Sequence, residues 1–157
     1  MTTPLRYYTR VRYQDCDAQH VVFNARYGDY VDLAVTEFLR ATFPGRDPFD
    51  GSLEIQVVRQ LIEWTAPARF NDVLEISVGA KRLGTTSVTI GFELRIAGTG
   101  DTIVTAEVVY VTVDPTTWKK RPLSVDERSR FEVGAAGRIT DHAGYYPIQT
   151  AGTAVLE

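Results

Sequence analysis

The chain has 157 residues, of which 44% are hydrophobic and 24% charged, and its formal net charge is −3. These values are typical of one globular domain with its own core, and they argue against a nucleic-acid or membrane partner. Two histidines and one cysteine argue against a structural zinc site. A single cysteine excludes an internal disulfide, and the N-terminus MTTPLRYYTR lacks an apolar signal segment. We therefore expect a cytoplasmic protein.

The first predicted elements are a strand and a long helix. Residues 6–13 alternate and are rich in Tyr, Val and Thr, which favours a strand. From residue 27 apolar side chains recur every three or four positions, the period of an amphipathic helix. They are Tyr27, Tyr30, Val31, Ala34, Val35, Phe38 and Leu39. Asn24 is the predicted N-cap of this helix, and the Pro- and Gly-containing segment 43–51 ends it.

The remaining chain is predicted to be mostly strand. Four strands are expected, over residues 53–64, 72–82, 86–96 and 102–113, and short turns between neighbours require antiparallel pairing. The last of them is apolar on both faces, as a central strand is. A short helix over 124–133, capped by Ser124, completes a single domain of residues 1–133. Residues 134–157 are expected to be a loosely ordered tail, in which Tyr145 and Tyr146 could dock.

One helix cannot cover both faces of such a sheet, so a face or an edge should pair with another subunit. We therefore expect an α+β fold and an oligomer.

The segment YQDCDAQHVVFNARYGDY, residues 13–30, places two carboxylates just before the start of the long helix. A helix start presents unpaired amides, which can stabilise an oxyanion. A carboxylate beside them can act as a nucleophile or a general base. This combination suits hydrolysis of a thioester, whose carbonyl is electrophilic and whose thiolate leaves easily.

The sequence VRYQDCDAQHVVFNARYGDYVDLAVTEFLRA resembles the Asp-loop and central helix of the hotdog-fold acyl-CoA thioesterases, the 4-hydroxybenzoyl-CoA thioesterase family. The resemblance extends in order and spacing over residues 6–133. It implies an antiparallel sheet wrapped around one long helix. It also implies an acyl-CoA or acyl-carrier-protein substrate, no cofactor, and a homodimer or homotetramer with sites between subunits.

The resemblance also implies roles for individual residues. Asp17 takes the position of the catalytic carboxylate, and Asn24 that of the catalytic residue that opens the helix. The substrate-binding residues expected beside them are His20, Phe23, Ala25, Lys81 and Arg82. Lys81, Arg82 and the basic run 119–121 could bind CoA phosphates, but short basic runs are more often simply solvated. His20 and Val35 depart from the family, which usually has Gly and often Arg at these positions.

Other interpretations of the same segment remain open. Asp17 could only cap a turn, whereas Asp15 is expected to hold the loop through backbone amides. Cys16 lies between two carboxylates, which disfavour a thiolate, so it is expected to be a small buried side chain. Asp15 and His20 have the spacing of the catalytic pair of hotdog enoyl-CoA hydratases. A third alternative is a non-catalytic module that only binds acyl thioesters.

Overall fold

The structure is a computed structural model that describes residues 3–135 and 137–145. Its longest element is the helix α1 (Arg26–Thr42). All seven apolar residues predicted for its stripe are buried. The predicted N-cap was wrong: Ala25 is the N-cap, and no side-chain hydrogen bond caps this end. Phe43 is the C-cap of the helix, and Pro44 and Gly45 follow it. Gly45 has a φ of 80°, which residues with a side chain rarely adopt.

Six strands form one sheet in the order β2-β5-β4-β3-β1-β6. Their bounds are β1 (Leu5–Arg10), β2 (Ile55–Trp64), β3 (Val73–Leu83), β4 (Ser87–Ile96), β5 (Thr102–Thr112) and β6 (Ile139–Asp141). The neighbouring pairs from β2 through β1 are antiparallel, and β6 runs parallel to β1. The four strands predicted after the helix are confirmed to within two residues at each end, and β5 is internal as its two apolar faces predicted.

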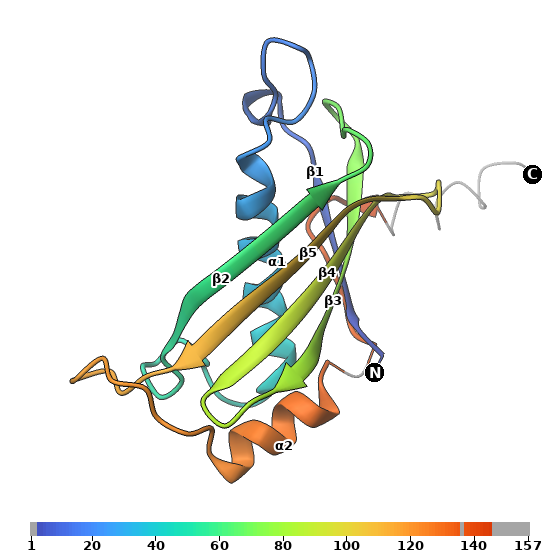
Figure 1. Cartoon of the computed structure of the whole chain (residues 1–157). Helices are drawn as coiled ribbons and strands as arrows, with labels where there is room; N and C mark the ends of the chain where they lie inside the picture. Colours follow the sequence, from blue (N-terminus) through green and yellow to red (C-terminus); the bar gives the residue numbers. More distant parts are fainter. Residues whose placement is uncertain (1–2, 136, 146–157) are drawn as a thin grey trace, which may run out of the picture.

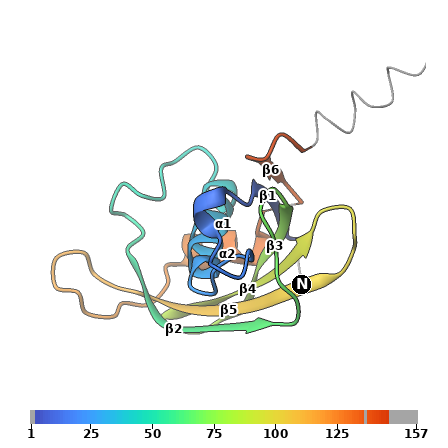
Figure 2. The same cartoon turned by 90° about the horizontal axis from the view of Figure 1, so that it is seen from above.

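The sheet curves around α1, so that one face covers the helix and the other faces away from it (Figures 1 and 2). Alternate residues of the three middle strands pack under the helix and are almost fully buried. They are Leu74, Ile76, Val78, Val88, Ile90, Leu94, Val104 and Val108. Each such side chain contributes about 1.5–3 kcal/mol on burial, so the strand alternation and the helix stripe together account for the core.

The strand β2 lies at one edge of the sheet and, among the described residues, pairs only with β5. Its side chains are mostly exposed, among them Val57 (54%), Val58 (56%) and Leu61 (41%). A register shift between Val57 and Arg59 marks a β-bulge. Within the described part of the chain, this ten-residue edge therefore has unpaired backbone groups along one side.

The chain after β5 forms a second helix that packs beyond the end of α1. The helix α2 (Val125–Val133) begins with the predicted Ser124 cap, whose Oγ accepts from the Glu127 amide at 3.1 Å. Its Phe131 ring packs edge-on against Phe43 beyond the end of α1, with centroids 5.3 Å apart.

The strand β6 was not predicted, and it lies in the region expected to be loosely ordered. It pairs with β1 from Arg6 to Tyr8, and Tyr145 then stacks on Tyr8 with ring centroids 5.3 Å apart. Tyr146, the other tyrosine expected to dock, lies outside the described residues.

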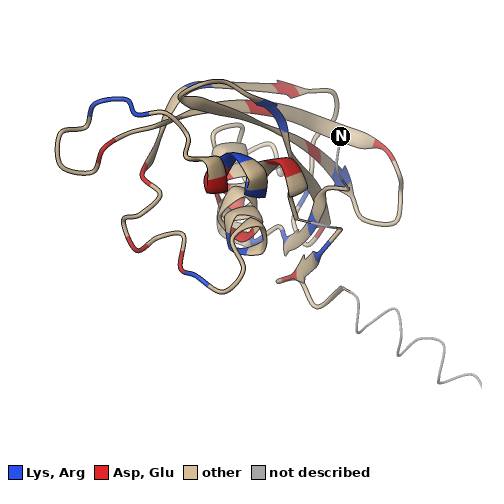
Figure 3. Ribbon diagram, turned by 90° about the horizontal axis from the view of Figure 1, so that it is seen from below, with Lys and Arg blue, Asp and Glu red and all other residues tan. Residues whose placement is uncertain are grey.

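Acidic and basic residues are interspersed over the strands and loops, and no face of one sign dominates the view in Figure 3. Within residues 3–135 and 137–145, the two α-helices are too short or too polar to cross a membrane.

Candidate functional site

The loop between β1 and α1 is held by Asp15, at the end of the 3-10 turn η1 (Tyr13–Asp15). Its side chain is 1% exposed. Its carboxylate accepts hydrogen bonds from the Arg12 backbone amide (2.9 Å), the Arg12 guanidinium (3.1 Å) and the Tyr30 hydroxyl (2.9 Å). Burial alone would raise the pKa of Asp15, but these hydrogen bonds outweigh it and hold the pKa below its ordinary value. Asp15 is thus a buried, fully engaged anion that fixes the loop.

Asp17 lies at the turn that follows and is half-buried. Its amide donates to the Val21 carbonyl at 2.9 Å, and its Oδ1 accepts from the Gln19 amide at 2.8 Å. His20, with a left-handed φ of 64°, closes the turn by donating its amide to the Asp17 carbonyl at 3.0 Å. Asp17 does cap a turn, therefore, but with one oxygen. Among the described residues, Oδ2 has no hydrogen-bond partner, so it is available for chemistry.

The start of α1, where this loop ends, provides unpaired donors. The Arg26 amide donates to the Phe23 carbonyl at 2.8 Å, and the Tyr27 amide donates to the Asn24 carbonyl at 3.4 Å. Within the described part of the chain, the amides of Asn24 and Ala25 have no partner. These two amides lie at the positive end of a 17-residue helix, where a developing negative charge is stabilised.

The connection between β2 and β3 forms the second wall of the site. Its Ala68 carbonyl accepts from the Val22 amide at 2.9 Å, and its Arg69 pairs with Val21 in an isolated antiparallel bridge. In Figure 1 this connection and the loop before α1 lie together at one end of the molecule. The Tyr27 hydroxyl, from α1, accepts from the Ala68 amide at 3.2 Å and fixes the wall to the helix.

A hollow of about 290 Å³ lies between the start of α1 and this wall. Its lining residues are Val22, Asn24, Tyr27, Trp64, Thr65, Ala66 and Pro67. Trp64, the last residue of β2, is 49% exposed and meets the Tyr27 ring edge-on, with centroids 6.1 Å apart. The hollow is mostly apolar, with Asn24 at its margin. Trp64 was not among the predicted site residues, although a tryptophan that ends a strand just before a turn is a signal that could have indicated it.

The structure brings together five of the seven predicted site residues. Asp17, His20, Phe23, Asn24 and Ala25 all lie on the loop or at the start of α1, and the last four are exposed. Phe23 is 47% exposed and its amide donates to the Asp15 carbonyl at 2.9 Å. The loop therefore displays these residues and keeps Asp15 beneath them.

Lys81 and Arg82 lie elsewhere. The strand β3 starts beside the loop, where Val73 pairs with Arg10, and Lys81 follows eight positions later, about 26 Å along the strand. Lys81 Nζ lies 3.4 Å from Glu107 Oε2. Within one chain, these two basic residues are thus not part of the site around Asp17.

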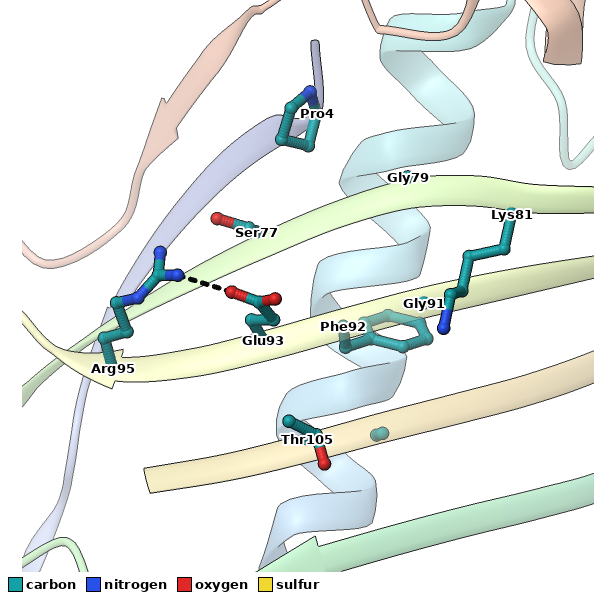
Figure 4. A pocket seen from close by; sticks show the side chains of 10 residues that line it. Pro4, Ser77, Gly79, Lys81, Gly91, Phe92, Glu93, Arg95 and Thr105 are labelled. Atoms are coloured by element: carbon teal, nitrogen blue, oxygen red, sulfur yellow. Dashed lines mark hydrogen bonds and ion pairs between the residues drawn. The ribbon is translucent and has the colours of Figure 1, made fainter. Parts of the chain in front are cut away.

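The Lys81 side chain crosses Gly91 on the sheet face away from α1 (Figure 4). A Cβ on Gly91 would lie 2.4 Å from Lys81 Cδ, so a larger residue there would displace the Lys81 side chain. Lys81 and Gly91 contribute to a hollow of about 310 Å³ on this outer face. In the basic run 119–121, Arg121 is already bound to Glu127 at 2.8 Å.

The pair expected for a hydratase is not assembled. Asp15 is buried beneath the loop, whereas His20 is exposed at the turn. No hydrogen bond joins their side chains within the described residues. Cys16 is half-buried, and its Sγ lies 3.8 Å from the Arg12 carbonyl oxygen, as suits a small packing residue.

Comparisons with known proteins identify the family of the chain. A family model described as the thioesterase-like superfamily matches residues 11–131. The chain is 37% identical over 124 residues to the acyl-CoA thioester hydrolase YbgC of Escherichia coli O6:H1. This match covers 78% of this chain and 91% of YbgC.

Solved structures match the fold as well. The crystal structure of the YbaW probable thioesterase from Escherichia coli superposes with a TM-score of 0.71 and 23% identity, over 82% of this chain and 96% of that one. A probable thioesterase from Bartonella henselae gives a TM-score of 0.68 and 26% identity, over 76% and 98% of the two chains. The predicted α+β hotdog fold is confirmed, and the chain belongs to the thioesterase-like superfamily.

Proposed function

We propose that this protein hydrolyses an acyl thioester, carried by CoA or by an acyl carrier protein, to a free acid and a thiol. One observation carries the proposal: on the loop that leads into α1, a half-buried Asp17 carboxylate with one unpartnered oxygen precedes two unpaired amides at the helix start. The name of the YbgC relative, an acyl-CoA thioester hydrolase, supports the same activity.

In the proposed reaction the thioester carbonyl oxygen accepts hydrogen bonds from the amides of Asn24 and Ala25. Asp17 Oδ2 either attacks the carbonyl carbon, giving an anhydride that water then opens, or removes a proton from a water that attacks instead. In both routes the C–S bond breaks, the thiolate leaves, and water supplies the oxygen of the new acid. The amides stabilise the charge that forms on the carbonyl oxygen.

Asn24 acts in this scheme through its backbone amide, and Ala25 contributes in the same way. Phe23 and the hollow below Trp64 would receive the start of the acyl chain, because both are apolar and next to these amides. His20 would line the approach to Asp17. Lys81 and Arg82 would contact CoA phosphates only from a second subunit, since they lie far from the loop of their own chain.

The proposed working form is a homodimer joined through the open edge of β2. Two such dimers could assemble into a tetramer through a different surface. Pairing of two β2 strands would satisfy the unpaired backbone groups and cover Val57, Val58 and Leu61. We also propose that the enzyme acts in the cytoplasm, where its single cysteine remains a thiol.

Release of thiol from short, long and aromatic acyl-CoAs, followed with a disulfide dye, tests the proposal. Asp17→Asn should lower kcat by about 10²–10⁴-fold, the usual contribution of a general base. The asparagine oxygen can still accept from the Gln19 amide, so the thermal unfolding midpoint should not change. Asp101→Asn, in the exposed turn before β5, is the matched control and should behave as the wild type.

The alternatives give different results. A binding module would bind CoA thioesters but release no thiol from any of them. A hydratase would consume 2-enoyl thioesters and would depend on His20 more than on Asp17. Full activity of Asp17→Asn would contradict the assigned role of this carboxylate.

A further inference from the structure

We propose that an exposed surface formed by Tyr13, Arg69 and Phe70, beside the Asp17 turn, binds the adenine nucleotide end of CoA. This inference rests on the proposed hydrolysis and adds to it the carrier of the acyl group. We call these three residues the nucleotide surface. An acyl carrier protein has the same pantetheine arm as CoA but no adenine, so the surface would favour CoA.

The aromatic residues of this surface are unusually exposed. Tyr13 is 84% exposed and Phe70 58%, and neither belongs to the core. The two rings, from segments 57 residues apart in the sequence, meet edge-on with centroids 6.2 Å apart and an interplanar angle of 82°. A single exposed aromatic ring is common, but two that meet in solvent next to a candidate active site offer a stacking platform for a base.

The third member of the surface, Arg69, supplies a positive charge. Among the described residues, its guanidinium has no hydrogen-bond or ion-pair partner. The other arginines near the loop are engaged: Arg10 with Asn71 and Ala143, Arg12 with Asp15, and Arg26 with Asp29. Arginine binds phosphate through two parallel N–H donors, and a CoA nucleotide carries a diphosphate and a 3′-phosphate.

The backbone that displays these side chains is fixed. The Arg69 amide donates to Asp72 Oδ2 at 2.8 Å, and the Asp72 amide returns to the Arg69 carbonyl at 3.1 Å. Asn71 has a left-handed φ of 69°, which asparagine tolerates better than most residues, and its amide donates to the Val11 carbonyl at 3.0 Å. Phe70 and Arg69 are therefore presented by a fixed turn, so that binding has to order their side chains but not the backbone.

The nucleotide surface lies within reach of the reacting centre. Arg69 pairs with Val21, and the Val21 carbonyl accepts from the Asp17 amide at 2.9 Å. Two such spacings place the backbones of Asp17 and Arg69 about 10 Å apart. One pantetheine arm can therefore connect a thioester at Asp17 with a nucleotide on this surface. Lys81, about 26 Å along β3 and paired with Glu107, is not placed for this within the same chain.

The test compares one acyl group on two carriers, CoA and pantetheine, with the intact protein. Phe70→Ala and Arg69→Gln should each raise KM for acyl-CoA about tenfold, the loss expected for one stacked base or one phosphate contact, and leave kcat unchanged. Neither should alter KM for acyl-pantetheine, which has no nucleotide. Trp118→Ala and Arg138→Gln are the controls, because they change an aromatic residue and an arginine that are exposed like Phe70 and Arg69 but lie away from the loop. They should leave KM for acyl-CoA and for acyl-pantetheine as in the wild type.

If Arg69→Gln raised KM equally for acyl-CoA and acyl-pantetheine, the proposal would be overturned. It would also be overturned if Arg82→Gln raised KM for acyl-CoA alone and Arg69→Gln did not. Calorimetry with adenosine 3′,5′-bisphosphate separates this inference from the hydrolysis. Binding that the wild type shows and Phe70→Ala loses would support the nucleotide surface even if no thioester were hydrolysed. Hydrolysis that depends on Asp17, together with no such binding, would leave the proposed function intact and refute the surface.

Discussion

The Tyr30 hydroxyl donates a 2.9 Å hydrogen bond to Asp15 Oδ2, and so ties the buried face of α1 to the loop that carries Asp17. Tyr30 is 3% exposed, and its side chain reaches from the helix stripe to a carboxylate that Arg12 neutralises. The position of the candidate catalytic turn therefore depends on a contact made inside the core.

Removing this hydroxyl should destabilise the protein. Tyr30→Phe leaves a buried carboxylate without one of its donors, which we expect to lower the free energy of unfolding by about 1–3 kcal/mol. Tyr110→Phe is the matched control, because the Tyr110 hydroxyl has no hydrogen bond among the described residues, and it should cost less than about 0.5 kcal/mol. Urea unfolding measures both, and equal losses in the two variants would contradict the assigned role of Tyr30.

Asp15 should also make the protein sensitive to acid. Its pKa is lower in the folded chain than the unfolded value of about 3.9, so its contribution is complete above that value and is lost as the pH falls through the folded pKa. Asp15→Asn should lower stability at neutral pH. Between roughly pH 5 and 2 its free energy of unfolding should also fall less steeply than that of the wild type. Parallel curves for the two proteins, measured by urea unfolding at each pH, would rule this linkage out.

Trp64 should control which acyl groups are accepted. Trp64→Ala opens one wall of the hollow next to Asn24, so bulky acyl chains should gain relative to short ones, by about tenfold in the ratio of their kcat/KM values. Hexanoyl-, benzoyl- and palmitoyl-CoA provide the comparison. Trp118→Ala, which changes the other tryptophan, should leave the ratio alone. If Trp64→Ala changed all three substrates by one common factor, the hollow would not be the acyl pocket.

The proposed dimer can be tested at the centre of the β2 edge. Leu61→Lys places two lysines near each other across a twofold axis, and their repulsion should raise the dimer dissociation constant at least about tenfold. Val133→Lys, at the exposed end of α2, is the control. Light scattering coupled to size-exclusion chromatography gives the mass, and an unchanged assembly of Leu61→Lys would place the interface elsewhere.

Much of the fold could be predicted from local sequence patterns. The helix stripe from Tyr27 to Leu39, the alternation in the strands and the Ser124 cap are signals within a few residues, and each is confirmed. The strand β6 escaped because it has three residues and its partner β1 lies about 130 positions away. The helix start was misplaced by one residue, since Asn24 has the preferred side chain of an N-cap but Ala25 has the position.

The candidate site was predicted in part for the same reason. The segment from Asp17 to Ala25 is continuous, so its residues could be grouped from the sequence alone. Trp64 contacts Tyr27, and Arg69 pairs with Val21, through contacts between distant segments that no spacing reveals. Lys81 has the right charge, but the length of β3 carries it to the other end of the chain's own sheet.

The short parallel strand β6 has a consequence for how copies of this protein can meet. It covers β1 over only three residues, and the Tyr145 ring then stacks on Tyr8, so this margin offers little backbone for a further strand. At the opposite margin, the ten residues of β2 have no second partner strand in the part of the chain that the structure describes. A sheet that can be extended at one margin only forms a closed pair, since two copies use up the available edge in joining. In the proposed dimer, β6 at the far margin would therefore disfavour the addition of further strands, the step by which exposed sheet edges aggregate.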